Sequence, residues 1–222
     1  MSEAAWSKVD GYFDSVLGLR DDVMERVLKA SSAAGLPEIN VTAAQGKLLQ
    51  LLVRSNGSKN VLEVGTLGGY SSIWMGRGLP AGGRVTTLEL KPEFAKVAEK
   101  NIAMAGLEKV VEVRVGKAIE SLPILAAEKR EPFDFVFIDA DKPSNADYFA
   151  WAMKLSQRGT IIVVDNVVRD GKVTEAGSED DGVKGARRVL EMMGKERRVE
   201  ATAIQTVGGK GWDGFAMAVV VE

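Results

Sequence analysis

The chain has 222 residues, of which 45% are hydrophobic and 27% charged, and this is the composition of an ordinary globular domain. It contains no cysteine and no histidine, which excludes disulfide bonds, thiol nucleophiles, serine–histidine triads and zinc sites built from these residues. The formal net charge of −2 provides no overall basic field that would attract nucleic acid.

The first 58 residues have a helical pattern. We predict helices over residues 5–17, 20–34 and 43–54, with breaks at Pro37 and at Asn56-Gly57-Ser58. We expect these helices to pack on a sheet formed by the rest of the chain and to line a site or a subunit contact. The predicted organisation is one domain over residues 1–222, with N-terminal helices over 1–58 and a core over 59–222.

The sequence gives no sign of a membrane segment. The longest apolar runs, such as Thr160–Val164, are much shorter than a bilayer crossing requires. Acidic residues stand near the N-terminus, where a signal peptide would be basic. We expect a cytoplasmic protein without a membrane partner.

From residue 60 onward, short β-branched runs alternate with helical stretches. The predicted strands are Asn60–Val64, Arg84–Leu90, Val110–Val115, Phe133–Asp139 and Thr160–Asp165. The helices between them are predicted at about 70–79, 92–105, 117–129 and 146–157. Strands such as VFID and IIVVD are apolar on both faces, as expected where helices cover a parallel sheet. This alternation predicts a doubly wound α/β fold.

The pattern changes after Asp165. A polar, glycine-bearing stretch over Arg169–Gly182 is either a mobile lid or a surface loop, and a helix follows at 183–194. Two strands, Val199–Val207 and Phe215–Val221, are joined by the glycine-rich connection GGKGWDG. We therefore predict seven strands, mostly parallel, with an antiparallel C-terminal hairpin. Trp212, in the connection, either faces an aromatic ligand or caps the hairpin.

Residues 61–71 run from the first strand through a glycine turn into a helix. Ligands bind at the carboxyl ends of strands in such sheets. A dinucleotide fingerprint would need a glycine at Leu67, so the turn disfavours NAD. Glu63, before the glycine at Gly65, suits a ligand with an ammonium and a sulfonium better than one with phosphates. Glu89 ends the second strand, where such folds place an acid that binds ribose hydroxyls; the alternative for both acids is a solvated strand end.

The fourth and fifth strands end in FIDADK (137–142) and VVDN (163–166). If these strands are neighbours, Asp139, Asp165 and Asn166 converge on one edge, and their oxygens suit Mg²⁺ or Ca²⁺. The alternative is an acidic edge that faces solvent or pairs with Lys142 or Arg169. Lys142 becomes a usable base if its pKa is lowered, although nearby carboxylates act in the opposite direction; otherwise it is a solvated lysine.

Three motifs, LEVGTLGGYS, FDFVFIDADK and DNVVRDGKV, carry a family resemblance. They look like the cation-dependent class I S-adenosylmethionine O-methyltransferases, the caffeoyl-coenzyme A and catechol O-methyltransferase family, especially its small bacterial members. The likeness covers roughly residues 36–222. It implies a class I methyltransferase, Rossmann-like, with a cofactor-binding core over 59–222. The implied reaction methylates a hydroxyl of a small vicinal dihydroxy aromatic, with S-adenosylmethionine and a divalent cation, Mg²⁺ before Ca²⁺ or Mn²⁺. A homodimer is also implied.

The resemblance assigns roles to individual positions. By it, Asp139, Asp165 and Asn166 bind the cation, and Lys142 with Asp139 is catalytic, Lys142 taking the hydroxyl proton or stabilising the oxyanion. The positions that would hold the cofactor are Val41, Glu63, Gly65, Ser71, Glu89, Ala118, Asp139 and Asp141. The chain departs from the family at Lys117, where an Asp beside the adenine is common, and in the glycine-rich segment around Trp212.

Three other functions remain open from the sequence. Related enzymes modify a hydroxylated base in transfer RNA, and a basic strip could serve this, although nucleic acid is disfavoured by the net charge. The strip consists of Arg187, Arg188, Lys195, Arg197 and Arg198. The others are a nicotinamide-linked oxidoreductase and a noncatalytic module that binds the cofactor. The sequence does not identify the acceptor, the regiochemistry or the physiological cation.

Overall fold

A computed structural model describes residues 2–129 and 131–222 of the chain. The chain forms two compact units, one over Lys8–Ser121 and one that contains Leu122–Glu222 together with the residues before Lys8. In chain order, the elements up to the end of the third strand are α1 (Glu3–Val16), α2 (Asp22–Ala33), α3 (Ala43–Ser55), β1 (Asn60–Val64), α4 (Tyr70–Gly76), β2 (Arg84–Glu89), α5 (Pro92–Met104) and β3 (Val111–Val115).

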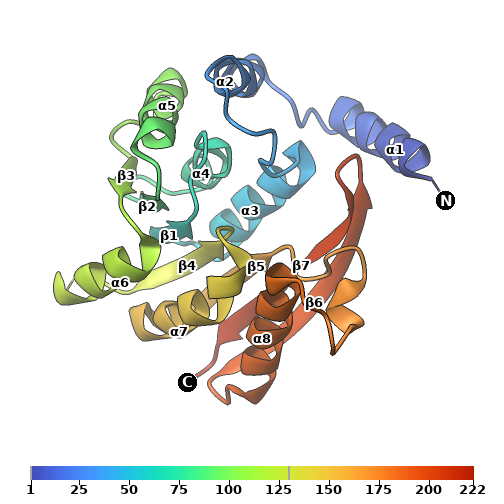
Figure 1. Ribbon diagram of the computed structural model, residues 1–222. Coiled ribbons are helices and arrows are strands. Elements are labelled where there is room, and N and C mark those ends of the chain that lie inside the picture. The colour runs from blue at the N-terminus through green and yellow to red at the C-terminus, as the bar shows by residue number, and fades with distance from the viewer. Residues whose placement is uncertain (1, 130) are drawn as a thin grey trace. The chain divides into compact units, whose positions relative to one another are not determined.

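The rest of the chain continues this alternation and then ends in a hairpin (Figure 1). The elements are α6 (Ala118–Ala127), β4 (Phe133–Ile138), the 3₁₀ turn η1 (Lys142–Ser144), α7 (Asn145–Leu155), β5 (Ser156–Asp165), a second 3₁₀ turn η2 (Lys172–Thr174), α8 (Asp181–Lys195), β6 (Val199–Gly208) and β7 (Gly211–Val220). These elements agree with the predicted ones, with ends shifted by a few residues.

The predicted fold class is confirmed. The seven-stranded sheet has the order β3-β2-β1-β4-β5-β7-β6. In the first unit, β1, β2 and β3 pair in parallel; in the second, β4 and β5 are parallel, whereas β7 is antiparallel to both β5 and β6. The strands β1, β2 and β4 are mostly buried and largely apolar, as at Leu62, Val85 and Phe135, because helical crossovers cover parallel strands, whereas β6 is mostly exposed.

The C-terminal hairpin is longer than the sequence predicts. The β6–β7 ladder continues to the pair Gly208↔Gly211, so the connection shrinks to residues 209–210 and Trp212 lies inside β7. The segment GGKGWDG was expected to be a loop because its glycines are rare in strand interiors. The ladder extends through them because Gly211, at φ 91°, adopts the left-handed backbone that a tight turn requires.

The N-terminal helices make most of their contacts with other helices. Helices α2 and α3 contact mainly other helices, α4 and α5, and α1 buries none of its residues. The apolar side chains of α1 are exposed, including Val9, Tyr12, Phe13 and Val16. None of the helices in the described part of the chain, α1 included, has the length and apolar content that a membrane crossing requires.

Helix α8 packs closely against the backbone of Lys142. The helix begins after Asp180, whose side chain accepts the Val183 N–H at 3.0 Å, and it packs against η1 and α7 (Figure 1). A Cβ atom at Gly185 would overlap the carbonyl of Lys142 and lie 2.9 Å from the Cα atom of Pro143. Only glycine therefore allows α8 to approach this closely.

We predict that Gly185→Ala lowers the free energy of unfolding by about 1–3 kcal/mol, because α8 must move away from η1 to make room for the methyl group. The matched control is Gly194→Ala in the same helix, where a Cβ would meet nothing within 4 Å. That change should stabilise the protein by up to about 1 kcal/mol, the difference in helix propensity. Urea unfolding of both variants checks this, and equal stabilisation by the two substitutions would contradict the close packing at Gly185.

Candidate functional site

The turn between β1 and α4 has an unusual backbone. Gly65, Leu67 and Gly69 all have positive φ, at 101°, 51° and 79°. The Gly65 N–H donates to the Leu88 carbonyl at 3.0 Å, which fixes the turn to the end of β2. A Cβ at Gly68 would overlap the hydroxyl of Ser31, so α2 closes directly over the turn. The predicted glycine turn is therefore held at the carboxyl end of β1 by contacts with β2 and α2.

Glu89 joins this turn to the end of β2. Its carboxylate accepts the backbone N–H groups of Thr66 at 3.3 Å and Leu67 at 2.8 Å on Oε2, and that of Lys91 at 2.9 Å on Oε1. The residue is only 6% exposed. Glu89 thus lies where the sequence places a ribose-binding acid, and it also shapes the turn itself. Its contact with ribose stays a prediction.

Glu63 is enclosed by α4. It is 0% exposed, and its oxygens accept the hydroxyls of Ser71, at 2.5 Å, and of Ser72. A buried carboxylate requires such donors because an unpaired charge is costly away from water. Glu63 thus lies beside Ser71, which is 9% exposed, and the contact of either residue with a cofactor stays a prediction.

The other predicted cofactor residues lie at the starts of helices. Val41 is buried and precedes Thr42, which caps α3 together with Gln45 in a reciprocal capping box. The Val41 carbonyl accepts the Asn40 side-chain amide at 2.9 Å. Ala118 is the first residue of α6 and is partly exposed. Their roles in cofactor binding stay predictions.

The carboxyl ends of β4 and β5 bring the predicted cation ligands together. The two strands are parallel neighbours with Ile138 opposite Val164, so Asp139 and Asp165 follow at adjacent positions. The strands are thus neighbours, as the predicted convergence requires, and cation binding by Asp139, Asp165 and Asn166 stays a prediction. The Lys142 Nζ donates to Asp139 Oδ1 at 2.7 Å, and both side chains are mostly buried, at 14% and 23% exposure.

The charges at this edge are unbalanced. Burial, and next the negative charge of Asp139, raise the pKa of Asp165 to about 7, although the Asn166 N–H and Lys142 act in the opposite direction. Asp165 is 5% exposed, and the Asn166 N–H donates to its Oδ1 at 2.8 Å. One lysine thus faces two neighbouring carboxylates, and the edge would gain from a further positive charge.

The turn after β5 runs alongside β7. The Val167 N–H donates to the Gly214 carbonyl and the Asp170 N–H to the Trp212 carbonyl, both at 3.1 Å. The turn contains the left-handed residues Asn166, Arg169 and Asp170, with φ between 55° and 59°. This conformation costs roughly 1 kcal/mol or more for each non-glycine residue, less for Asn and Asp, so the turn needs contacts that hold it.

Two residues of β7 hold this turn, and sequence reasoning missed one of them. Asp213 accepts the N–H groups of Val168 at 3.0 Å and Arg169 at 3.1 Å. The Trp212 ring covers Gly171, where a Cβ would lie 2.6 Å from the indole, and its Nε1 donates to Gln205 at 3.0 Å. These contacts support a packing role for Trp212. In the sequence, Asp213 is marked only by its position among the glycines that precede an apolar run.

Asp141, another predicted cofactor residue, is engaged within its own segment. Its carboxylate accepts the hydroxyls of Ser144 and Tyr148, both at 2.5 Å. Burial and this carboxylate raise the pKa of Tyr148, so its phenol is a donor at all ordinary pH values. Asp141 therefore fastens η1 to α7, and its contact with a cofactor stays a prediction.

In residues 2–129 and 131–222, no group of three or more His, Cys, Asp or Glu side chains gathers as a metal site would require. The cation ligands predicted at the β4–β5 edge are two carboxylates, Asp139 and Asp165, and the side-chain amide of Asn166. Such a set leaves several positions of a hard cation to oxygen atoms of water or of an acceptor.

Comparison with known proteins gives one consistent family. A family model described as O-methyltransferase matches residues 15–216. A catechol O-methyltransferase from Niastella koreensis is 50% identical over 220 residues, which are 99% of this chain and 100% of that protein. A catechol O-methyltransferase from Mycobacterium tuberculosis is 52% identical over 212 residues, covering 96% of this chain and 94% of that protein.

A solved structure of an O-methyltransferase also matches this chain along almost its whole length. The O-methyltransferase from Bacillus cereus, determined in complex with SAH, is 53% identical and superposes with a TM-score of 0.97, covering 99% of this chain and 100% of that one. The likeness thus includes the β1–α4 turn, the β4–β5 edge and the C-terminal hairpin in one continuous match. The chain belongs to the O-methyltransferase family and is a class I, S-adenosylmethionine-dependent O-methyltransferase.

Proposed function

We propose that this enzyme methylates one hydroxyl of a catechol-like, vicinal dihydroxy aromatic molecule in a reaction that requires a divalent cation, Mg²⁺ in the first place. The observation that carries the proposal is the buried oxygen edge formed by Asp139 and Asp165 beside Lys142. The names of the two catechol O-methyltransferases support the acceptor class. Two adjacent hydroxyls suit this edge because they offer the paired oxygens that a hard cation prefers.

The residues present fit a divalent cation. Asp139, Asp165 and Asn166 would hold it through carboxylate and amide oxygens, the donors that Mg²⁺ and Ca²⁺ prefer. The raised pKa of Asp165 reports a carboxylate whose charge the surrounding protein leaves under-compensated, and a cation would relieve it. When bound, such a cation supplies Lewis acidity that makes an acceptor hydroxyl easier to deprotonate.

The chain's own residues would supply the remaining steps. Lys142, whose ammonium donates to Asp139, would stabilise the oxyanion that forms as the hydroxyl proton leaves to water, or would take that proton itself after first losing one of its own to water. The Gly65 turn, with Glu89 and Ser71, holds the methyl donor. The acceptor oxygen forms the new O–CH₃ bond as the S–CH₃ bond of S-adenosylmethionine breaks, which leaves S-adenosylhomocysteine. Alignment of the two partners supplies much of the acceleration, and no nucleophilic side chain is needed.

The test is a panel of catechol, caffeoyl esters and flavonoids with labelled S-adenosylmethionine, with and without a chelator. We predict that chelation abolishes product formation and that Mg²⁺ restores it. Asp139→Ala should lower kcat/KM by about 100-fold or more, because it removes a cation ligand and the partner of Lys142.

The matched control is Asp147→Ala on α7, whose exposed carboxylate lies 3.7 Å from the guanidinium of Arg188. It should keep wild-type kcat/KM. Calorimetric titration should give wild-type affinity for S-adenosylmethionine in Asp147→Ala, and in Asp139→Ala it measures how much of the loss comes from the cofactor contact that the resemblance assigns to Asp139. Product formation that persists in chelator and in Asp139→Ala would exclude the cation mechanism.

The stability of the metal-free protein should depend on pH through Asp165. Because the folded-state pKa of Asp165, about 7, exceeds its ordinary value of 3.8, folding favours the protonated carboxyl. In the metal-free protein, the contribution of Asp165 to the free energy of unfolding is therefore fully present below pH 4. It is lost as the pH rises through 7, and it amounts to about 1.4 kcal/mol for each unit by which the two pKa values differ. Mg²⁺ affinity changes oppositely and tightens from pH 6 to 8, because the proton competes.

Urea unfolding in chelator between pH 5 and 8 measures the first effect. Asp165→Asn should flatten the curve over this range, whereas Asp147→Asn should leave its slope as in the wild type. A metal-free stability that rises between pH 6 and 8, or a slope that survives in Asp165→Asn, would show that Asp165 does not titrate as inferred.

We also propose that a second copy of the chain covers the exposed apolar side chains of α1. Tyr12 is 64% and Phe13 45% exposed, which is unusual for a stable helix in water unless a partner covers it. Light scattering should give about twice the chain mass of 23.8 kDa. The double change Tyr12→Asp and Phe13→Asp should yield monomers, and Lys8→Ala on the same helix should not. A monomeric wild type at micromolar concentration would end this proposal.

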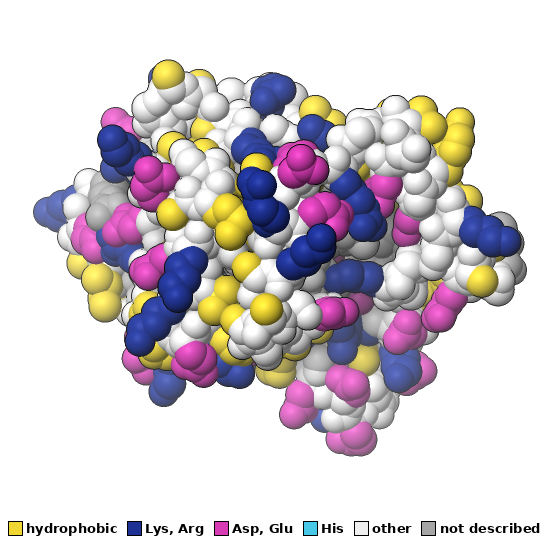
Figure 2. All heavy atoms as spheres, turned by 90° about the horizontal axis from the view of Figure 1, so that it is seen from above, with side chains coloured by type: hydrophobic (Ala, Val, Ile, Leu, Met, Phe, Trp, Pro, Cys, Tyr) yellow, Lys and Arg dark blue, Asp and Glu magenta, His cyan; other side chains and the backbone are white. Residues whose placement is uncertain are grey.

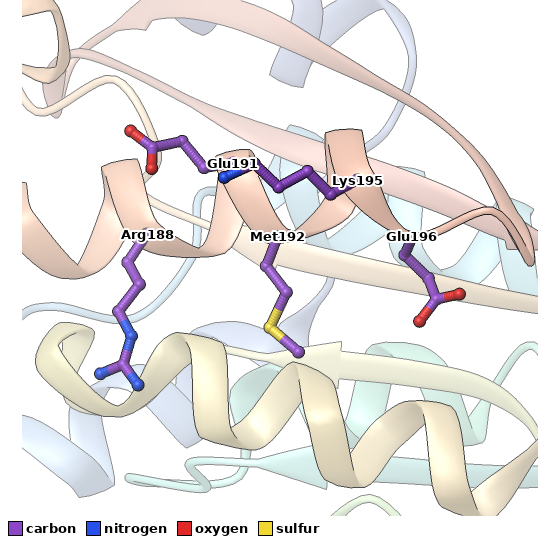
Figure 3. Close-up of a pocket in the computed structure, with 5 residues that line it drawn as sticks. All are labelled: Arg188, Glu191, Met192, Lys195 and Glu196. Carbon is purple, nitrogen blue, oxygen red and sulfur yellow. The ribbon is translucent and has the colours of Figure 1, made fainter.

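The structure offers no support for a transfer RNA acceptor. Acidic and basic side chains are interspersed on the face shown in Figure 2. In the basic strip, Arg198 pairs with Glu196 at 2.7 Å and Arg187 donates to the Val173 carbonyl. Figure 3 shows Arg188 and Lys195 around a hollow on α8 that Glu191 and Glu196 also line. A phosphate backbone would meet acids here as well as bases.

A further inference from the structure

The turn that follows β5 is held in place by one carboxylate of the neighbouring strand. Asp213 Oδ1 accepts three N–H groups, those of Val168 at 3.0 Å, Arg169 at 3.1 Å and Gly214 at 2.9 Å. Two of these donors belong to the turn, and one of them, Arg169, has a left-handed backbone. Asp213 thus stabilises a conformation that the turn would not adopt by itself.

The residue after Asp213 makes this arrangement possible. Gly214 is buried, and a Cβ there would overlap the Ile204 carbonyl of β6 and lie 2.8 Å from the side chain of Val168. The turn and β6 can therefore both approach β7 only because position 214 is glycine. This Asp-Gly pair accounts for a part of the glycine-rich segment that the proposed reaction leaves without a role.

The same turn carries a proposed cation ligand. Asp165 pairs with Phe215 at the end of the β5–β7 ladder, and Asn166 follows it with φ at 59°. Beyond Asn166, the backbone is tied to β7 at Gly214, at the Asp213 carboxylate and at Trp212. Loss of the Asp213 anchor would leave two N–H groups of the turn unpaired and free the segment that sets the direction of the Asn166 amide.

We propose that Asp213 is a positioning residue for the cation site: its carboxylate oxygen fixes the turn after β5 so that Asn166 and Asp165 present their oxygens together. This inference rests on the proposed cation-dependent function. It differs from a ligand role for Asp213, because a hydrogen-bond acceptor is enough to hold the turn, and the negative charge that Asp213 also places near Asp165 is the smallest of the influences on that carboxylate. Residues that orient metal ligands in this way typically change metal affinity by about 10–100-fold when removed.

The test compares Asp213→Ala, which removes the acceptor, with Asp213→Asn, which keeps an acceptor oxygen and removes the charge. The probe is Mn²⁺, titrated into the metal-free full-length protein and followed by electron paramagnetic resonance. We expect Asp213→Ala to weaken Mn²⁺ binding about 10–100-fold and Asp213→Asn to stay within about threefold of the wild type. Glu200→Ala, an exposed acid on β6, is the control and should bind as the wild type does.

Amide hydrogen exchange gives a readout independent of the metal. The N–H groups of Val168 and Arg169 should exchange faster in Asp213→Ala and remain protected in Asp213→Asn. If Asp213→Ala does not fold, Asp213→Ser replaces it, because the serine hydroxyl is too short to accept both groups.

Each outcome decides one point. Tight Mn²⁺ binding by Asp213→Ala, with both amides exposed to exchange, would overturn the positioning role and leave the proposed function intact. Equal loss of Mn²⁺ binding in Asp213→Ala and Asp213→Asn would overturn it in favour of a charge or ligand role. A wild-type protein that does not bind Mn²⁺ would overturn the proposed cation dependence, and this inference with it.

Discussion

Repulsion between two carboxylates at neighbouring strand ends is the constraint on which the rest of this site depends. Asp139 and Asp165 follow the paired residues Ile138 and Val164, and parallel strands leave them no freedom to move apart. Lys142 compensates the charge of Asp139, and burial disfavours the ionised form of Asp165. A fold that keeps such a pair in place is poised to take up either a proton or a cation.

The elements around this edge all restrain it from different sides. Helix α8 is seated on the Lys142 carbonyl through Gly185, and Asp141 ties the same 3₁₀ turn to Tyr148. On the other side, β7 holds the turn after Asp165 through Asp213. The strain stored in that turn is tolerated because several independent contacts impose it, which is how preorganised sites are commonly built.

Much of the fold and the main features of the site could be predicted because they follow local rules. Apolar runs alternating with helical stretches specify parallel strands, and parallel strands bring their carboxyl ends to one edge, which placed Asp139 beside Asp165. What could not be predicted depends on contacts distant in sequence. The β6–β7 ladder includes Trp212 and Asp213, although the glycines around them locally suggest a loop. The left-handed backbone at Arg169 depends on contacts with this same strand. The enclosure of Glu63 by two serines likewise follows from the packing of α4.

Cation binding at the β4–β5 edge is tested by a crystal structure of the protein grown with Mn²⁺, S-adenosylhomocysteine and an inert catechol, with diffraction recorded at the manganese absorption edge. We expect one strong anomalous peak within bonding distance of Asp139, Asp165 and Asn166, with both catechol oxygens beside it and the sulfur of the cofactor facing one of them. A peak located elsewhere, or a catechol seated in the crystal far from Asp139 and Asp165, would contradict it.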